Sequence, residues 1–462
     1  MSSPKPRLTE GPVGRHLADM AVPVLLGITT MMAQGLIDTW FIGRVGDAEL
    51  AAYGFSFPIL MIVTSVAIGL GAGTSSVVAR AIGSDDHRRA RRLSTDSLLL
   101  SFVVTACVSF IGVLTINPLF RLLGAPDDLI PLIRGFMMIL YAGVPFIVVG
   151  MVGMASMRAT GDTRLPSALM ILAAVLNVIL DPILIFGVGP IPAMGLNGAA
   201  MAALLARASI FIGTLYLMRM RLDMVSFSKP DPVEMRESWR DILHVGIPAA
   251  GTNAIVPIGA AVITAMIARY GADAVAGFGV ASRIESMMLV MYYALSAIIG
   301  PFVGQNFSAG KEDRILRSLW LCSAFCIISG LVIAAFLAVA SGVLPGLFSD
   351  SDSVKSVTST FLWIVPISYG TYGMVMVMNA SFNGLGHPMP AVYISVGRIV
   401  VLYVPLALVG MHFFDVAGIF AGYAIANIVS GIGAYIWARN TVRSRCAKGG
   451  SVEVQPVTET LT

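Results

Sequence analysis

The chain has 462 residues, of which 56% are hydrophobic and only 12% are charged, and its mean hydropathy is +0.84. A soluble protein of this length needs far more charge to cover its surface, so the composition excludes a soluble globular fold. The net charge of +4 comes from basic loops between apolar runs, and we therefore expect no nucleic-acid partner.

The first apolar run begins near Ala21 and continues through Gln34 and Asp38, which is longer than a signal-peptide core. Similar runs recur along the chain, each long enough for the roughly 20 residues that cross a bilayer. We predict an all-α integral membrane protein with about twelve transmembrane helices, surrounded by a lipid bilayer. The predicted spans are residues 17–43, 52–80, 94–116, 129–155, 165–187, 196–218, 242–268, 273–304, 317–342, 356–382, 389–411 and 416–438.

The basic residues are distributed unevenly over the predicted loops. If both termini are cytoplasmic, the tails and loops on that side hold 22 of the 30 lysines and arginines. The loops on the other side hold only Arg44, Arg121, Arg269 and Lys355. The positive-inside rule therefore predicts a multi-pass protein with both termini in the cytoplasm.

An internal repeat relates the two halves of the chain. Pro23 matches Pro248 and Gly46 matches Gly271, and both pairs are 225 residues apart (248 − 23 and 271 − 46). Six predicted spans separate the copies, and because this number is even, the repeats are parallel. We predict two six-helix lobes. Residues 1–16 are a cytoplasmic tail, 17–225 the first lobe, 226–241 a cytoplasmic linker, 242–440 the second lobe, and 441–462 a cytoplasmic tail.

The linker opens with the turn sequence SKPDP, and its remainder suits a short interfacial helix.

Four polar residues interrupt two apolar spans of the first lobe. Gln34 and Asp38 stand i, i+4 in the first span, and Asn177 and Asp181 do so in the fifth. A bare carboxylate in hydrocarbon is costly and needs a reason. At 1.5 Å per residue, Asp181 lies roughly 24 Å and Asp38 roughly 30 Å from the cytoplasmic start of its span, so both fall in the outer half of the membrane. We predict that these four residues form one cation-coupling site.

A carboxylate removed from water holds a proton more tightly, and two carboxylates that share a site strengthen this effect. Such a pair can carry a proton, or it can ligate Na⁺ together with an amide carbonyl, and the sequence leaves both possibilities open. The repeat places Ile263 at the position of Asp38, so the first lobe would perform this role alone.

Simpler interpretations exist for these residues. Asp38 lies six residues from Arg44 and could be a hydrated acid at the outer interface, and Asn177 could form an interhelical hydrogen bond. Their joint occurrence in one lobe favours the functional interpretation.

Glu285 and Arg398 are the other unusual charges. Glu285 follows Arg283 near the start of the eighth predicted span and could form an ordinary ion pair. Arg398 has no partner that the sequence identifies, and an arginine facing lipid in mid-span is unfavourable. The roles of both residues stay open.

No motif requires a metal, a cofactor or a catalytic residue. The four cysteines have no metal-site spacing and indicate no disulfide framework. We therefore predict no metal site and no cofactor, and an ion gradient as the energy source.

Several motifs together resemble a known family. They are Pro23 with Asp38 fifteen residues later, VGDAELAAYG after the first span, LNVILDPILIFG in the fifth span, and VGQNFSAGK at 303–311. On these residues the chain resembles the MATE (multidrug and toxic compound extrusion) transporters over roughly residues 15–440, and it is most similar to their DinF-like branch.

The resemblance implies two six-helix lobes around a V-shaped cleft in a bacterial cytoplasmic (inner) membrane, functioning as a monomer. It implies export of cationic or amphipathic drugs or metabolites in exchange for H⁺ or Na⁺, with Asp38, Asn177 and Asp181 at the coupling positions. It also implies that the first helix bends near Pro23.

The chain departs from the family pattern in two places. GAAMAALLA (198–206) has no hydroxyl where relatives often carry one. The second-lobe acids of another branch are missing, since the seventh span offers Asn253 and residues 356–382 contain no acid. This argues against a sodium site in the second lobe.

Three alternatives fit less well. A lipid-linked precursor flippase of the same superfamily would carry more basic residues in its cavity than Arg398 and Arg283. A membrane-bound prenyl-transfer enzyme would need paired Asp-rich motifs on cytoplasmic loops, which are missing. A major-facilitator transporter would show a second-loop pattern that ARAIGSDDHRRARR does not reproduce.

Overall fold

The computed structural model describes residues 8–226 and 231–447. Parts of the predicted tails and of the linker, including most of its SKPDP turn, lie outside these residues. Within the described part, nearly every residue belongs to a helix or a short connection, and the β-structure is a single isolated bridge between Val188 and Ile191.

Six helices form the first lobe. They are α1 (Val13–Gly43), α2 (Asp47–Gly83), α3 (His87–Leu122), α4 (Ile130–Ala159), α5 (Arg164–Phe186) and α6 (Gly195–Met220).

The second lobe has the same number of spans but more breaks. Its elements are α7 (Pro232–Ile267), η1 (Ala268–Tyr270), α8 (Ala272–Met288), α9 (Val290–Ser308), α10 (Glu312–Ala340), η2 (Leu344–Leu347), α11 (Asp352–Ile364), η3 (Val365–Ser368), α12 (Tyr369–Gly384), α13 (Met389–Val396), η4 (Gly397–Tyr403) and α14 (Val404–Ala447).

Ten segments are long and apolar enough to cross a membrane, and α8 with α9 form an eleventh span that is bent by 45°. The last of the ten, Met389–Cys446, is 58 residues long and contains two spans, because its backbone leaves the helical conformation at Phe414 and Asp415. Beyond this break, Gly418 packs against the backbone of Gly410, so the two helices run back along each other. The described chain therefore has twelve spans, as predicted.

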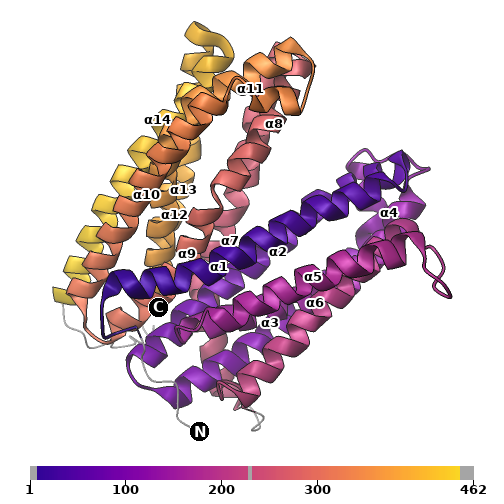
Figure 1. The fold of residues 1–462 in the computed structure, drawn as a ribbon. Coiled ribbons are helices and arrows are strands. Elements are labelled where there is room, and N and C mark those ends of the chain that lie inside the picture. The colour runs from indigo at the N-terminus through magenta and orange to yellow at the C-terminus, as the bar shows by residue number, and fades with distance from the viewer. Residues whose placement is uncertain (1–7, 227–230, 448–462) are drawn as a thin grey trace, which may run out of the picture.

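Figure 1 shows α1–α6 and α7–α14 as two bundles that lie together at one end and diverge toward the other. We call these the joined end and the splayed end. The bundles meet along α2 and α7, where added Cβ atoms at Gly69 or Gly73 would overlap the backbone of α7 around Gly246. Glycine at these positions lets two helices from different lobes approach backbone to backbone.

At the joined end, Gln305 of α9 links the lobes. Its Nε2 donates to the carbonyl of Ala159 in the first lobe at 2.7 Å, and its Oε1 accepts from the backbone N–H of Leu8 at 3.3 Å. Arg314 of α10 donates to the carbonyls of Leu8 at 2.8 Å and of Glu10 at 3.1 Å. The segment before α1 is therefore attached to the second lobe.

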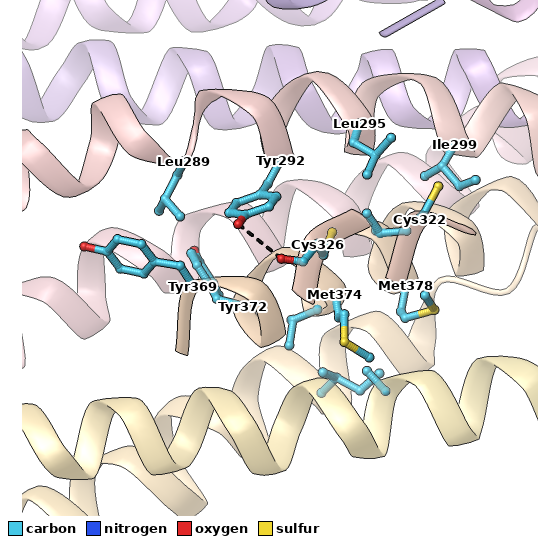
Figure 2. Close-up of a cluster of buried hydrophobic side chains, with 14 of the residues drawn as sticks. Leu289, Tyr292, Leu295, Ile299, Cys322, Cys326, Tyr369, Tyr372, Met374 and Met378 are labelled. Atoms are coloured by element: carbon cyan, nitrogen blue, oxygen red, sulfur yellow. Dashed lines mark hydrogen bonds between the residues drawn. The ribbon is translucent and has the colours of Figure 1, made fainter. Parts of the chain in front are cut away.

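There are two apolar cores, and each extends beyond its lobe: the second-lobe core includes Leu17, Met20 and Val24 of α1, and the first-lobe core includes Ile242 of α7. Figure 2 shows part of the second-lobe core, where Leu295 and Ile299 of α9 pack near Cys322 and Cys326 of α10. Both cysteines are buried and free, so they serve in packing.

The linker differs from the prediction in one respect. The Asp231 side chain accepts from the backbone N–H of Val233 and caps α7, which begins at Pro232 and continues to Ile267. Residues 232–241 are thus the first turns of a spanning helix and not a separate interfacial helix. A strong N-terminal cap with proline in the first position, and no break afterwards, explains the continuity.

Candidate functional site

The structure brings together the four polar residues that the sequence singled out. Gln34 and Asp38 lie on one face of α1, Asn177 and Asp181 lie on one face of α5, and these two helices pack against each other. Gln34 Nε2 donates to Asp38 Oδ2 at 3.1 Å, and the Gln34 side chain also contacts the Asn177 amide.

Asn177 is fully buried, and its side chain lies within hydrogen-bonding distance of Asp38. In the amide orientation that gives both of its polar atoms a partner, Asn177 Nδ2 donates to Asp38 Oδ1 at 3.0 Å. Its Oδ1 then accepts from the backbone N–H of Ala203 in α6 at 3.1 Å. Because the Asn177 nitrogen then also faces the Gln34 amide, one of the two amides donates to Asp38 in either orientation, and the two amides are hydrogen-bonded to each other.

Asp181 is in the opposite situation. Its side chain is only 1% exposed, and neither of its carboxylate oxygens has a hydrogen-bond donor. It lies against the carboxyl group of Asp38, which offers only acceptors when ionised. A buried acceptor without a donor is costly. A proton on either carboxyl would create an O–H···O bond between the two, so this geometry is suited to binding a proton.

Two further residues complete the site, and the sequence interpretation missed both. Arg207 of α6 lies close enough for its charge to act on Asp38 and Tyr53, and Tyr53 of α2 lines the same cavity. Arg207 directly follows the GAAMAALLA segment, whose lack of a hydroxyl had suggested a sparse polar network. The available signal was a single arginine eleven residues into an otherwise apolar span.

A cavity of about 50 Å³ opens beside these side chains, lined by Asp38, Tyr53 and Arg207 and otherwise mainly by apolar residues. One water needs roughly 10–15 Å³ of such space, so a few water molecules or a small ion fit. Drug-sized ligands occupy pockets of about 300–1,000 Å³. In this conformation the first-lobe site admits a coupling ion but no large substrate.

Pro23 lies within α1, which runs without a break from Val13 to Gly43. It stands fifteen residues before Asp38, which is about 22 Å along a helix, so it is not part of the polar cluster. Its predicted role in bending the helix remains a prediction.

The second-lobe charges have partners that the sequence did not identify. Glu285 Oε1 accepts from the hydroxyl of Tyr423 at 3.2 Å, and Arg398 donates to Asn427 Oδ1 at 2.9 Å. Arg283 is exposed and makes no ion pair with Glu285 in the described part of the chain, so the ordinary pair that the sequence allowed is not formed.

The described residues contain no group of three or more histidine, cysteine, aspartate or glutamate side chains that could hold a metal ion. Asn253, the seventh-span residue at the position of a possible second-lobe sodium site, donates to the carbonyl of Ala249 in its own helix at 2.9 Å.

Comparison with known proteins agrees with this architecture. The MatE family model matches residues 23–183 and 248–409, which are the two repeats and most of the chain. The chain belongs to the MatE family. As a MATE transporter it moves small molecules across a membrane and is not an enzyme. This agrees with the prediction of a transporter and with the prediction that the chain has no catalytic residue.

Relatives cover almost the whole MATE chain. It is 39% identical over 432 residues to a FAD transporter of Shewanella oneidensis, covering 94% of this chain and 96% of the relative. It is 24% identical to the probable multidrug resistance protein YoeA of Bacillus subtilis, covering 93% and 95%. The crystal structure of the Vibrio cholerae MATE transporter VcmN in the bent form superimposes with a TM-score of 0.89 at 30% identity, covering 94% and 98%. The two-lobe membrane fold is thereby established.

Proposed function

We propose that this MATE transporter exports amphipathic small molecules in exchange for protons, and that Asp38 and Asp181 carry the proton. The observation that supports this most strongly is the buried Asp181 carboxyl, which has no donor and lies against Asp38. Two carboxylates in a dry site cannot both remain ionised at low cost, and one shared proton removes the conflict.

The surrounding side chains explain how the proton can leave again. The linked amides of Gln34 and Asn177 orient Asp38 with an N–H group, and the positively charged Arg207 lines the cavity on its open side. When water enters the site, hydration lowers the free energy of the ionised carboxylate, and the proton is released. One charge crossing 100 mV supplies about 2.3 kcal/mol, and each unit of pH difference adds about 1.4 kcal/mol.

The same amides argue for H⁺ over Na⁺. A sodium ion needs oxygen ligands, but one amide presents an N–H group to Asp38 and the two amides are hydrogen-bonded to each other. The two carboxylates and at most one amide carbonyl then remain as ligands among these four side chains. That is too few for a metal ion, whereas two carboxyl groups can share one proton.

Orientation and substrate belong to the same proposal. The positive-inside rule puts the joined end in the cytoplasm of a bacterium, in its inner membrane, with the transporter acting as a monomer. Movement of the lobes would open the other side, with α1 bending near Pro23.

Candidate substrates are cationic or amphipathic drugs or metabolites, as the family resemblance implied, and FAD, which the Shewanella relative is named for transporting.

The test uses the full chain in vesicles with an imposed pH gradient or sodium gradient, and follows transport of ethidium and FAD. Asp38→Asn keeps the size of the side chain but cannot release a proton, so gradient-driven transport should fall at least tenfold. Asp19→Asn is the matched control, because Asp19 lies on the same helix but is exposed. Unchanged transport by Asp38→Asn, or transport driven by sodium alone, would overturn the proposal.

A further inference from the structure

The second lobe holds a group of polar side chains that proton coupling does not use. Glu285 of α8 and Arg398 of η4 have opposite charges and lie within electrostatic range of each other. In the described residues no ion pair within 4.0 Å joins them, and each binds a neutral partner instead. Charges buried only for stability are expected to make direct contact, because separation leaves each desolvation cost uncompensated.

Arg398 is prepared for an anion. Its side chain is 4% exposed, and one N–H donates to Asn427, which is itself held by Ser368 at 3.1 Å. Its guanidinium carbon lies 4.6 Å from the ring centroid of Tyr372, while its Nε has no partner. A fixed guanidinium with an unused N–H and no carboxylate in contact is the usual receptor for a phosphate or carboxylate.

Tyrosine rings surround these charges. The ring centroids of Tyr403 and Tyr423 lie 4.8 Å apart. Tyr293 is 41% exposed and lies close enough to Glu285 for the two side chains to interact electrostatically. Figure 2 shows Tyr369 and Tyr372 at one edge of the apolar core, with the Tyr369 hydroxyl pointing away from Cys322 and Met378. That hydroxyl is buried and has no partner. Among these rings Tyr293 is exposed and offers a face for stacking, and the unpaired Tyr369 hydroxyl can form a further hydrogen bond.

The backbone departs from regular helix at the same place. Arg398 belongs to a π-helix, Gly397–Tyr403, and the span that carries Glu285 bends by 45° beside Leu289. π-Helical turns cost stability and occur frequently at functional sites. Here the wider turn and the bend coincide with the two charges.

We propose that Glu285, Tyr372, Arg398 and Tyr423 form the substrate-recognition site of this transporter, and that its ligand is a flat conjugated ring bearing an acidic group, as in a flavin phosphate. Arg398 binds the acidic group, the tyrosines bind the ring, and Glu285 accepts a ring N–H. This assignment rests on the proposed export function and places its substrate in the lobe opposite the proton site. The small size of the first-lobe cavity is consistent with this separation.

The experiment measures equilibrium binding to the purified full-length protein by flavin fluorescence. FAD and FMN should bind at least tenfold more tightly than riboflavin, which has the same ring without phosphate. Arg398→Gln should weaken FAD binding at least tenfold and abolish its advantage over riboflavin, while Arg398→Lys should retain part of it. Arg317→Gln, which changes an exposed arginine stacked on Trp320, is the control.

Either of two results with Arg398→Gln and the wild type would overturn the inference, and so would a third with the reserve variant below. One is FAD binding by folded Arg398→Gln at wild-type strength. The other is tighter binding of ethidium than of FAD, which would favour cationic substrates. Tyr423→Phe serves as a second variant if Arg398→Gln does not fold, because it removes only the hydroxyl that holds Glu285, and it should weaken FAD binding at least threefold. Unchanged binding by Tyr423→Phe would count against the site.

The proton proposal is tested separately by Asp38→Asn, which should bind FAD normally and lose driven transport. Driven transport by Asp38→Asn together with lost binding by Arg398→Gln would defeat the coupling proposal alone.

Discussion

In the first lobe two carboxyl groups, those of Asp38 and Asp181, lie against each other, whereas in the second lobe Glu285 lies across from Arg398. The repeat gives both lobes the same helices, yet the 225-residue offset places Ile263 at the position of Asp38 and Leu60 at that of Glu285. The buried charged residues of the two lobes therefore occupy positions that the repeat does not relate. Like charges suit reversible binding of a proton, and opposite charges that are held apart suit a larger ligand with groups of both kinds.

The comparison can be sharpened most strongly with Asp181→Asn. The new asparagine amide would donate a hydrogen bond to the Asp38 carboxylate, so the site would be stable without a bound proton. Driven transport should therefore fall about a hundredfold. Binding of FAD should stay within twofold of wild type, since the second lobe is untouched. Vesicle transport and equilibrium binding of FAD, measured on one preparation, check this. A large loss of FAD binding would show that the proton site and the substrate site are not separated between the lobes.

Arg207→Gln is expected to have an intermediate effect. Arg207 is the positively charged side chain that lines the cavity beside Asp38, so its removal leaves the ionised acid without a counter-charge there. Driven transport should fall by about tenfold, which is less than for Asp181→Asn. Arg207→Lys, which keeps the charge, should retain most of the transport. Vesicle transport measures this, and equal losses in both variants would mean that Arg207 does not act through its charge.

The smallest effect is expected from Gln305→Ala at the joined end. The substitution removes the hydrogen bond that Gln305 donates to the carbonyl of Ala159 in the first lobe and the one that it accepts from the backbone N–H of Leu8. Each such bond contributes about 1 kcal/mol, so thermal stability should fall modestly. Hydrogen exchange should rise near residues 8–11 and at the end of α4, and equal protection in both proteins would contradict a link between the lobes there.

Much of the first-lobe site was predictable because its members lie in pairs four residues apart. An i, i+4 spacing puts Gln34 with Asp38, and Asn177 with Asp181, on one face whatever the tertiary fold is. Arg207 and Tyr53 were missed because their relation to Asp38 depends on how α6 and α2 pack against α1. The same limit applied to Arg398, whose partner Asn427 lies on the next span.

The amino-acid sequence by itself determined the membrane class, the number of spans, the parallel repeat and the acidic pairs of the first lobe. These features depend on hydropathy and on helical period, which are local properties of the chain. Only the tertiary structure decided that Asp181 would lack a donor, and that Glu285 would bind Tyr423 instead of Arg283. The physical reason is that a buried charge is satisfied by whichever helices become its neighbours, and helix neighbours are set by the packing of the whole bundle.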